Sequence, residues 1–348
     1  MSMQSLLQIG IDHLSAPIRF RERLAACGAD LGRTLSELRD EAALEEVAAL
    51  STCSRFEVYA RVAADQPSRA LLRAWFDRKL GPGSRDCVLE RRDHDSVRHA
   101  FRVAAGLDSW ILGESEILGQ VKKAYQTALA AGFTGPLLNR VLQSAVAAGK
   151  KARAQTGIQD GIHSIGGAAA VLAQRIFGPA KRGSALVFGA GQAAEAVCRH
   201  LAAKNFDDVI VANRTRERAA DLARRVGGRP AAFEEGLELL SRVEVAVFST
   251  SCSRPVVDKA ALRARLQGRG RPVFLIDLGL PRNVAPDCAA LSGVFLYDLE
   301  DLKGVAAESV ARKAPAKQAA ETIVESAALE CARQLEKAGI RLAEEALS

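Results

Sequence analysis

Apolar and polar positions alternate in two ways over the first 62 residues. Residues 6–11 and 47–50 are almost continuously apolar, and residues 56–62 alternate as a strand with one buried face does. Residues 21–26 have a helical pattern instead. This succession predicts an α/β domain whose sheet is antiparallel or mixed.

The next hundred residues are predicted to be rich in helix. Residues 93–156 carry apolar side chains at spacings of three and four, at positions 117, 118, 121, 124 and 125 and again at 138, 141, 142 and 146. A further amphipathic helix over residues 164–177 is expected to end at Gly178-Pro179. We expect a second domain to begin near that point.

Strand-like runs then alternate with helical stretches such as residues 219–226. The predicted strands cover residues 185–188, 209–212, 243–249, 273–278 and 294–297. This rhythm is typical of parallel βαβ units, and the handedness of their crossovers favours a doubly wound sheet. Beyond Leu302 an Ala/Glu/Lys/Arg-rich tract predicts one long helix that is broken or begins near Pro315.

Length and composition agree with this division. With 348 residues, of which 48% are hydrophobic, the chain can build two globular domains and an accessory segment. We therefore predict an α/β protein with an N-terminal α/β catalytic domain (1–160), a Rossmann-type domain (161–302) and a C-terminal helical segment (303–348).

Charge and cysteine content narrow the environment and leave the function open. The formal net charge of +7 and the pI near 9.2 favour polyanions, although arginines spread over a solvated surface are the more common explanation. The seven cysteines lack CxxC spacing, and neither a signal peptide nor an apolar run of membrane-spanning length is recognised. We expect a reduced, cytoplasmic protein that binds no metal and no membrane.

Cys53 is the candidate nucleophile. It lies in the loop Ser51-Thr52-Cys53-Ser54-Arg55, between an apolar run and a predicted strand. The charge of Arg55 is expected to favour the thiolate that nucleophilic attack requires. The alternative is that Cys53 is a small buried hydrophobic residue. His99 could carry a proton or be structural, and its distance in sequence from Cys53 does not decide between these roles.

A glycine turn marks the candidate nucleotide site. The segment Gly189-Ala190-Gly191-Gln192-Ala193-Ala194 follows a predicted strand and opens an amphipathic helix. Such a turn lets backbone N–H groups approach a pyrophosphate at the helix N-terminus. A tight turn without a ligand is the alternative. Together with a reactive thiol, a dinucleotide site indicates the reduction of an acyl group.

The end of the next predicted strand indicates which dinucleotide binds. Enzymes that use NAD usually carry Asp or Glu there, whereas this chain has Asn213-Arg214-Thr215-Arg216. A guanidinium on Arg214, helped by Thr215 or Arg216, can neutralise a 2′-phosphate. The sequence therefore predicts NADPH, with a solvated basic loop as the alternative.

The segment from Gly106 to Gln120 gathers polar residues before a helix. Glu114 or Ser115 could cap that helix. Capping does not account for Asp108, Ser109 and Gln120, which exceed what a cap needs.

These motifs together resemble the glutamyl-tRNA reductase family. The resemblance runs from about Ile9 to Leu302, and its motifs are Ser51–Arg55, His99–Ser109, Leu112–Gln120, Gly189–Gly191, Asn213–Thr215, Asp277–Arg282 and Leu296–Asp298. It implies that Cys53 attacks the ester of glutamyl-tRNA to form a thioester. Reduction by NADPH would then give glutamate-1-semialdehyde, in the first step of the five-carbon route to tetrapyrroles.

The resemblance also assigns roles to individual residues. Arg55 would hold the substrate carboxylate and His99 would assist catalysis. The substrate pocket would include Thr52, Ser54, Ser109, Glu114, Ser115, Glu116 and Gln120. Because the thiol and the dinucleotide turn lie in different domains, we expect a hinge motion to bring them together.

Several positions depart from the family pattern. Ser54 replaces an Asn, Ser115-Glu116 replace a Pro-Gln pair, and Asp12 and Leu14 replace an Asn and a Lys. The alternatives are a paralogue that reduces another aminoacyl-tRNA and a non-catalytic relic that binds charged tRNA. An enzyme of the shikimate dehydrogenase type is a third alternative, and it would not need Cys53.

The family also implies partners. These are glutamyl-tRNA itself and, as a candidate, glutamate-1-semialdehyde aminotransferase. A homodimer would follow from the family's helical dimerisation domain. Only 46 residues, 303–348, follow Leu302, which puts dimerisation by that route in doubt.

Overall fold

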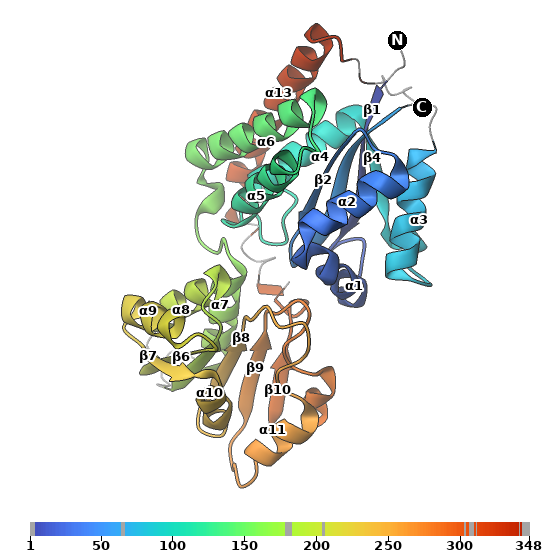
Figure 1. The fold of residues 1–348 in the computed structure, drawn as a ribbon. Coiled ribbons are helices and arrows are strands. Elements are labelled where there is room, and N and C mark those ends of the chain that lie inside the picture. Colours follow the sequence, from blue (N-terminus) through green and yellow to red (C-terminus); the bar gives the residue numbers. More distant parts are fainter. Residues whose placement is uncertain are drawn as a thin grey trace. The chain divides into compact units, whose positions relative to one another are not determined.

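The computed structural model divides the chain into two compact units (Figure 1). One comprises Met1–Gly161 with Val310–Ser348, and the other comprises Ile162–Ser309. The structure describes residues 4–63, 67–177, 183–203, 206–302, 304–305, 310, 312–340 and 342. The predicted helix stop at Gly178-Pro179 lies outside these residues.

The sheet of the first unit is antiparallel throughout, which settles the choice between antiparallel and mixed. Its strand order is β2-β3-β1-β4, and the strands are β1 (Gln4–Asp12), β2 (Glu46–Ser51), β3 (Arg55–Ala63) and β4 (Leu89–Arg92). The register of β1 with β3 pairs Asp12 with Arg55. The start of β3, next to the Cys53 loop, is therefore fixed by a central strand.

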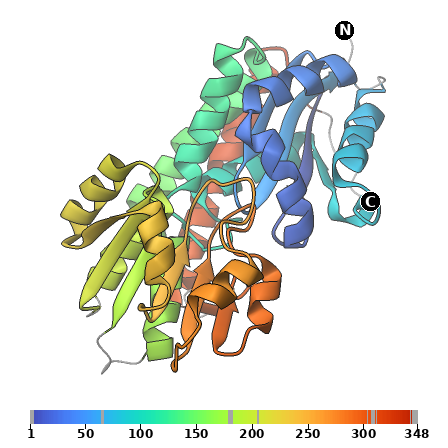
Figure 2. The ribbon, with the colours of Figure 1, turned by 60° about the horizontal axis from the view of Figure 1, so that its bottom comes forward.

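Helices cover both faces of this sheet. On one side are α1 (Ile18–Ala29), α2 (Leu31–Ala42) and α3 (Ser68–Leu80). On the other are α4 (Asp93–Ala105), α5 (Ile117–Ala130), α6 (Pro136–Gln155) and α13 (Ala314–Lys337) (Figures 1 and 2). Phe56 of β3 stacks on Trp75 of α3 with ring centroids 5.9 Å apart, whereas Tyr59 points to the opposite helices. This alternation is the one predicted for residues 56–62.

The C-terminal helix begins at the proline that the sequence marks. Pro315 lies in the first turn of α13, where its missing N–H costs no intrahelical hydrogen bond. The helix buries Ala320, Val324, Ala328 and Leu335 and packs along α4 and α6. It therefore belongs to the core of the first unit.

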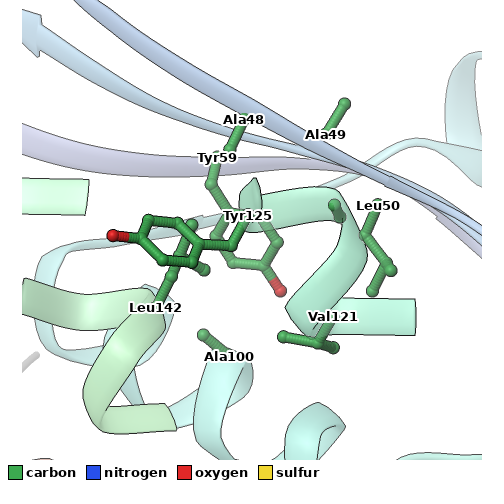
Figure 3. A pocket seen from close by; sticks show the side chains of 9 residues that line it. Ala48, Ala49, Leu50, Tyr59, Ala100, Val121, Tyr125 and Leu142 are labelled. Atoms are coloured by element: carbon green, nitrogen blue, oxygen red, sulfur yellow. The ribbon is translucent and has the colours of Figure 1, made fainter. Parts of the chain in front are cut away.

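A small apolar cavity lies between the sheet and helices α4, α5 and α6 (Figure 3). The rings of Tyr59 and Tyr125 both line it. Their hydroxyls are satisfied outside the cavity, because Tyr59 donates to Glu57 Oε2 over 2.8 Å and Tyr125 accepts from Gln143 Nε2 over 2.6 Å. The lining of the cavity is thus almost entirely apolar.

The second unit has the predicted doubly wound parallel sheet. Its strand order is β10-β9-β8-β5-β6-β7, with every neighbouring pair parallel. The strands are β5 (Ser184–Phe188), β6 (Asp208–Asn213), β7 (Arg229–Ala232), β8 (Val245–Phe248), β9 (Val273–Asp277) and β10 (Val294–Tyr297). The chain reverses direction across the sheet between β5 and β8, where ligands of such folds bind.

Helix α7 (Ile165–Phe177) precedes the first of these strands. The helices between successive strands are α8 (Gln192–Ala203), α9 (Arg216–Val226), α10 (Phe233–Leu239) and α11 (Lys259–Arg265). Short 3-10 helices cover Arg85–Cys87 and Gly157–Gln159 in the first unit and Pro286–Ala290 in the second. Among the described residues, none of the helices is long and apolar enough to cross a membrane.

Candidate active site

The Cys53 loop is a tight turn between β2 and β3 that other side chains hold in place. Thr52 Oγ1 accepts hydrogen bonds from the backbone N–H groups of Ser54 (3.1 Å) and Arg55 (3.2 Å). Arg21 of α1 is buried and donates from Nη1 to the Cys53 carbonyl over 3.0 Å. Cys53 itself is half-buried. No local sequence pattern marks Arg21 as a support of this loop.

Electrostatics keep the thiol protonated. Burial and the carboxylates of Glu114 and Glu116 raise the pKa of Cys53 to about 12, against the opposing effect of Arg21. Among the nearby charges, the cation that lowers the pKa of Cys53 is Arg21. Activation of the thiol by Arg55 stays a prediction. The effect of Glu114 and Glu116 also shows that both carboxylates lie within electrostatic reach of the sulfur.

Arg55 begins a buried polar network on the face of β3 that is covered by α4, α5 and α6. Its Nη1 donates to Glu57 Oε1 over 2.5 Å, and its Nη2 donates to the carbonyl of Asp108. Glu57 also contacts His99 Nε2 at 2.9 Å. Because Arg55, Glu57 and Tyr59 alternate along one strand, all three polar groups fall on the same face.

Both ring nitrogens of His99 are held by carboxylates. Nε2 faces Glu57, and Nδ1 lies 3.1 Å from Asp108 Oδ2. Burial opposes the charged ring, but Glu57 and Asp108 outweigh it and raise the pKa of His99. The chain of ion pairs continues from Asp108 to Arg102 over 2.9 Å. These contacts favour a structural role, and proton transfer by His99 stays a prediction.

Four of the predicted substrate residues carry buried polar atoms without a hydrogen-bond partner. These atoms are Arg55 Nε, Ser109 Oγ, Glu114 Oε2 and Gln120 Oε1. Buried polar atoms in folded proteins are nearly always paired with protein groups, ordered water or a ligand, so these four atoms are available to a polar ligand. A guanidinium N–H together with carboxylate, amide and hydroxyl oxygens suits a ligand with both acidic and ammonium groups, such as an aminoacyl group.

The main chain around Glu114 is fixed from two sides. Gly113 has a φ of +75°, and Arg153 donates to the carbonyls of Glu114 (2.7 Å) and Ser115 (3.0 Å). The cap residue of α5 is Glu116, and no side chain caps this helix. The capping role considered for Glu114 and Ser115 is therefore wrong. Ser115 is exposed and Glu116 is half-buried.

The glycine turn of the second unit is shaped by close backbone contact. Gly189 has a φ of +112°, and a Cβ there would lie 2.1 Å from the Ser249 carbonyl oxygen. Gly191 and Gln192 are exposed at the start of α8, while Ala194 is buried beneath it. Ala190 and Ala193 lie between these positions. The exposed start of this helix, at the end of β5, fits a dinucleotide pyrophosphate.

The end of β6 presents a cation. Arg214 is exposed, its Nη2 lies 2.7 Å from Cys252 Sγ, and its guanidinium lies over the Phe233 ring. Asn213 donates from Nδ2 to the Thr215 carbonyl over 3.1 Å, which shapes the loop. No carboxylate occurs from 213 to 216. These residues fit an anionic group on a ribose.

Asp277, at the end of β9, organises a neighbouring loop. Its carboxylate accepts from the backbone N–H groups of Gly279 (2.9 Å), Asn283 (2.7 Å) and Val284 (2.8 Å). Burial raises its pKa to about 6 despite these bonds. This motif therefore shapes the edge of the sheet at which the nucleotide is expected. Among the described residues, no cluster of His, Cys, Asp or Glu could hold a metal ion.

The two units thus define an oxidoreductase with a thiol-bearing unit and a Rossmann-type unit for a nicotinamide cofactor. Models of two domain families match the chain: the N-terminal domain of glutamyl-tRNAGlu reductase over residues 9–156, and shikimate / quinate 5-dehydrogenase over residues 171–305. The second match covers the nucleotide-binding unit.

Curated relatives agree with this class. A glutamyl-tRNA reductase of Deinococcus radiodurans is 40% identical over 317 residues, which are 91% of this chain and 89% of the relative. One of Pseudomonas aeruginosa is 37% identical over 335 residues, covering 95% and 79%. The solved glutamyl-tRNA reductase of Methanopyrus kandleri is 32% identical, with a TM-score of 0.52 and coverage of 96% and 81%. The chain belongs to the glutamyl-tRNA reductase family.

Proposed function

We propose that this chain reduces the glutamyl group of glutamyl-tRNA to glutamate-1-semialdehyde, with NADPH as the reductant, in the first step of five-carbon tetrapyrrole synthesis. The observation that carries the proposal is the set of unpaired polar atoms on Arg55, Ser109, Glu114 and Gln120. Glu114 of this set lies within electrostatic reach of Cys53. An acyl group with a carboxylate and an ammonium would satisfy these atoms.

The first half of the reaction takes place in the first unit. Cys53 Sγ attacks the ester carbonyl, the bond to the ribose oxygen of the tRNA breaks, and the thiol proton ends on that oxygen. Arg55 binds the side-chain carboxylate of the substrate, and Glu114 attracts its ammonium group. Thr52 and Ser54 hold the turn that presents the sulfur, and Ser115 and Glu116 border Glu114.

The second half needs the other unit. When bound, NADPH supplies the hydride that turns a thioester into an aldehyde. Gly189 to Ala194 would face its pyrophosphate, and Asn213, Arg214 and Thr215 would bind its 2′-phosphate. Cys53 leaves as a thiolate and, because its pKa is about 12, takes up a proton at once. We propose that a hinge between the units brings the acylated sulfur and the cofactor together.

Incubating the protein with glutamyl-tRNA and NADPH tests this function. Aldehyde should form in step with NADPH oxidation and tRNA release. Glutaminyl-tRNA and free glutamate serve as controls, since the first lacks the side-chain carboxylate and the second lacks the activated ester. Failure to form aldehyde from glutamyl-tRNA would end the proposal.

Replacing Arg214 with Ala should raise KM for NADPH about tenfold or more and leave KM for NADH almost unchanged. The reason is that the guanidinium contacts a phosphate that only NADPH carries. Steady-state kinetics with both cofactors measure the difference. Arg218→Ala, an exposed arginine on α9, is the matched control. Equal effects on both cofactors would contradict the phosphate contact.

Glu114 should give the reaction a pH dependence near neutrality. Burial and the nearby Glu116 raise the pKa of Glu114 to about 7. Since only the ionised form attracts an ammonium group, kcat/KM for glutamyl-tRNA should contain a step that rises through about pH 7. Glu114→Gln should lower kcat/KM above that pH and remove the step. If the step persists in this variant, another group is responsible.

Two partner assignments are part of the proposal. The aldehyde product carries an amino group next to the carbonyl, so we propose glutamate-1-semialdehyde aminotransferase as the enzyme that consumes it. A homodimer stays a prediction, which sedimentation of the purified chain can test.

A further inference from the structure

Lys313 is a buried cation in an unfavourable place. It is 5% exposed and lies at the N-terminal cap of α13. Burial lowers the pKa of Lys313, and the nearby charge of Asp160 offsets only part of this effect. The positive end of the helix dipole also disfavours a cation there. Helix stability therefore does not account for a lysine at this position.

The ammonium of Lys313 joins separate segments of the first unit. Its Nζ donates to the carbonyl oxygens of Leu112 and Ile158, each over 3.0 Å. Gly113 lies between these partners and Glu114, and a Cβ on Gly113 would be 2.1 Å from the Ile158 oxygen. The main chain that aims Glu114 is thus packed tightly against the two carbonyls that Lys313 binds.

The same cluster lies beside both points where the chain passes between the units. The chain leaves the first unit after Gly161 and re-enters it at Val310. Ile158 shortly precedes the exit, and Lys313 shortly follows the re-entry. A single ammonium therefore ties the two crossing segments to each other and to the Glu114 loop.

We propose that Lys313 is a positioning residue, which sets the main chain of Glu114 by binding the Leu112 and Ile158 carbonyls. The kinetic consequence rests on the proposed function. The structural consequence, that Glu114 is held near Cys53, does not.

The test compares Lys313→Met, which keeps the length of the side chain, with Lys337→Met, an exposed lysine on the same helix. The readout is the rate of Cys53 alkylation by iodoacetamide against pH, followed by peptide mass spectrometry. Release of Glu114 from its place lowers the pKa of the thiol, so Lys313→Met should react several-fold faster at pH 8. Loss of a positive charge alone would slow the reaction.

The kinetic arm measures glutamyl-tRNA reduction. Lys313→Met should lower kcat/KM for glutamyl-tRNA about tenfold or more, because a small misplacement of a binding group strongly lowers the reaction rate. The affinity for NADPH should stay unchanged. If Lys313→Met does not fold, Lys313→Gln, which keeps N–H donors without the charge, takes its place and should behave in the same direction. Folded variants with alkylation unchanged or slower overturn the proposal. If the native chain forms no aldehyde, the proposed function fails, and the alkylation rates alone test the positioning role of Lys313.

Discussion

Replacing Cys53 with Ser should lower kcat for aldehyde formation from glutamyl-tRNA by at least about a thousandfold. A serine hydroxyl is a much weaker nucleophile than a thiol in the same turn. If it were acylated, the product would be an oxygen ester no easier to reduce than the substrate. A thioester is more readily reduced, and only a thiol can form it. Single-turnover assays of tRNA release and of aldehyde formation measure the two halves of the reaction separately.

The serine variant should remain folded and bind NADPH as before, because serine is nearly the size of cysteine and Cys53 is half-buried in a turn of the first unit. Cys87→Ser is the matched control, since Cys87 is also half-buried in the first unit. That control should keep full activity. Aldehyde formation by Cys53→Ser at a comparable rate would remove Cys53 from its assigned role.

The sequence predicts the parts of the fold that depend on local patterns. The strands of the parallel sheet are buried runs with clear limits, and five of the six were recognisable. β7 was not, because Arg229–Ala232 is a short edge strand that contains a proline and pairs with β6 alone. β4 was also not recognised, because its sequence Leu-Glu-Arg-Arg is mostly polar. Both strands are short and carry few large apolar side chains, whereas the apolar edge strands β2 and β10 were recognised.

The site was predictable where its residues are neighbours in sequence. The Cys53 turn and the glycine turn are both contiguous, and the structure places them at strand ends as expected. Arg21 and Lys313 were missed because they act on carbonyls 32 and 201 residues away. One signal was available for Arg55. Its alternation with Glu57 and Tyr59 puts three polar side chains on one face of a strand, which predicts a buried polar network.

Replacing Arg55 with Met should lower the free energy of unfolding by about 3–5 kcal/mol and abolish activity. Arg55 is buried with Glu57, so its loss leaves a carboxylate without its closest cation. Burial opposes ionisation of Glu57, and His99 and Arg55 together hold its pKa well below the usual range. Urea denaturation followed by circular dichroism measures the loss. Arg61→Met is the matched control on the same face of β3. Because Arg61 is partly exposed, its pairs with Glu45 and Glu46 contribute about 1 kcal/mol or less.

A second variant separates the structural role of Arg55 from its role in binding. Arg55→Lys keeps a charge beside Glu57 and should recover much of the lost stability. Lysine has no counterpart of Nε, the one Arg55 nitrogen left unpaired for a ligand, and it cannot bind a carboxylate through a planar fork. We therefore expect a folded Arg55→Lys protein whose KM for glutamyl-tRNA is raised tenfold or more, on the order expected for one lost charged contact. Full activity in this variant would show that Arg55 only supports Glu57 and that the substrate carboxylate is bound elsewhere.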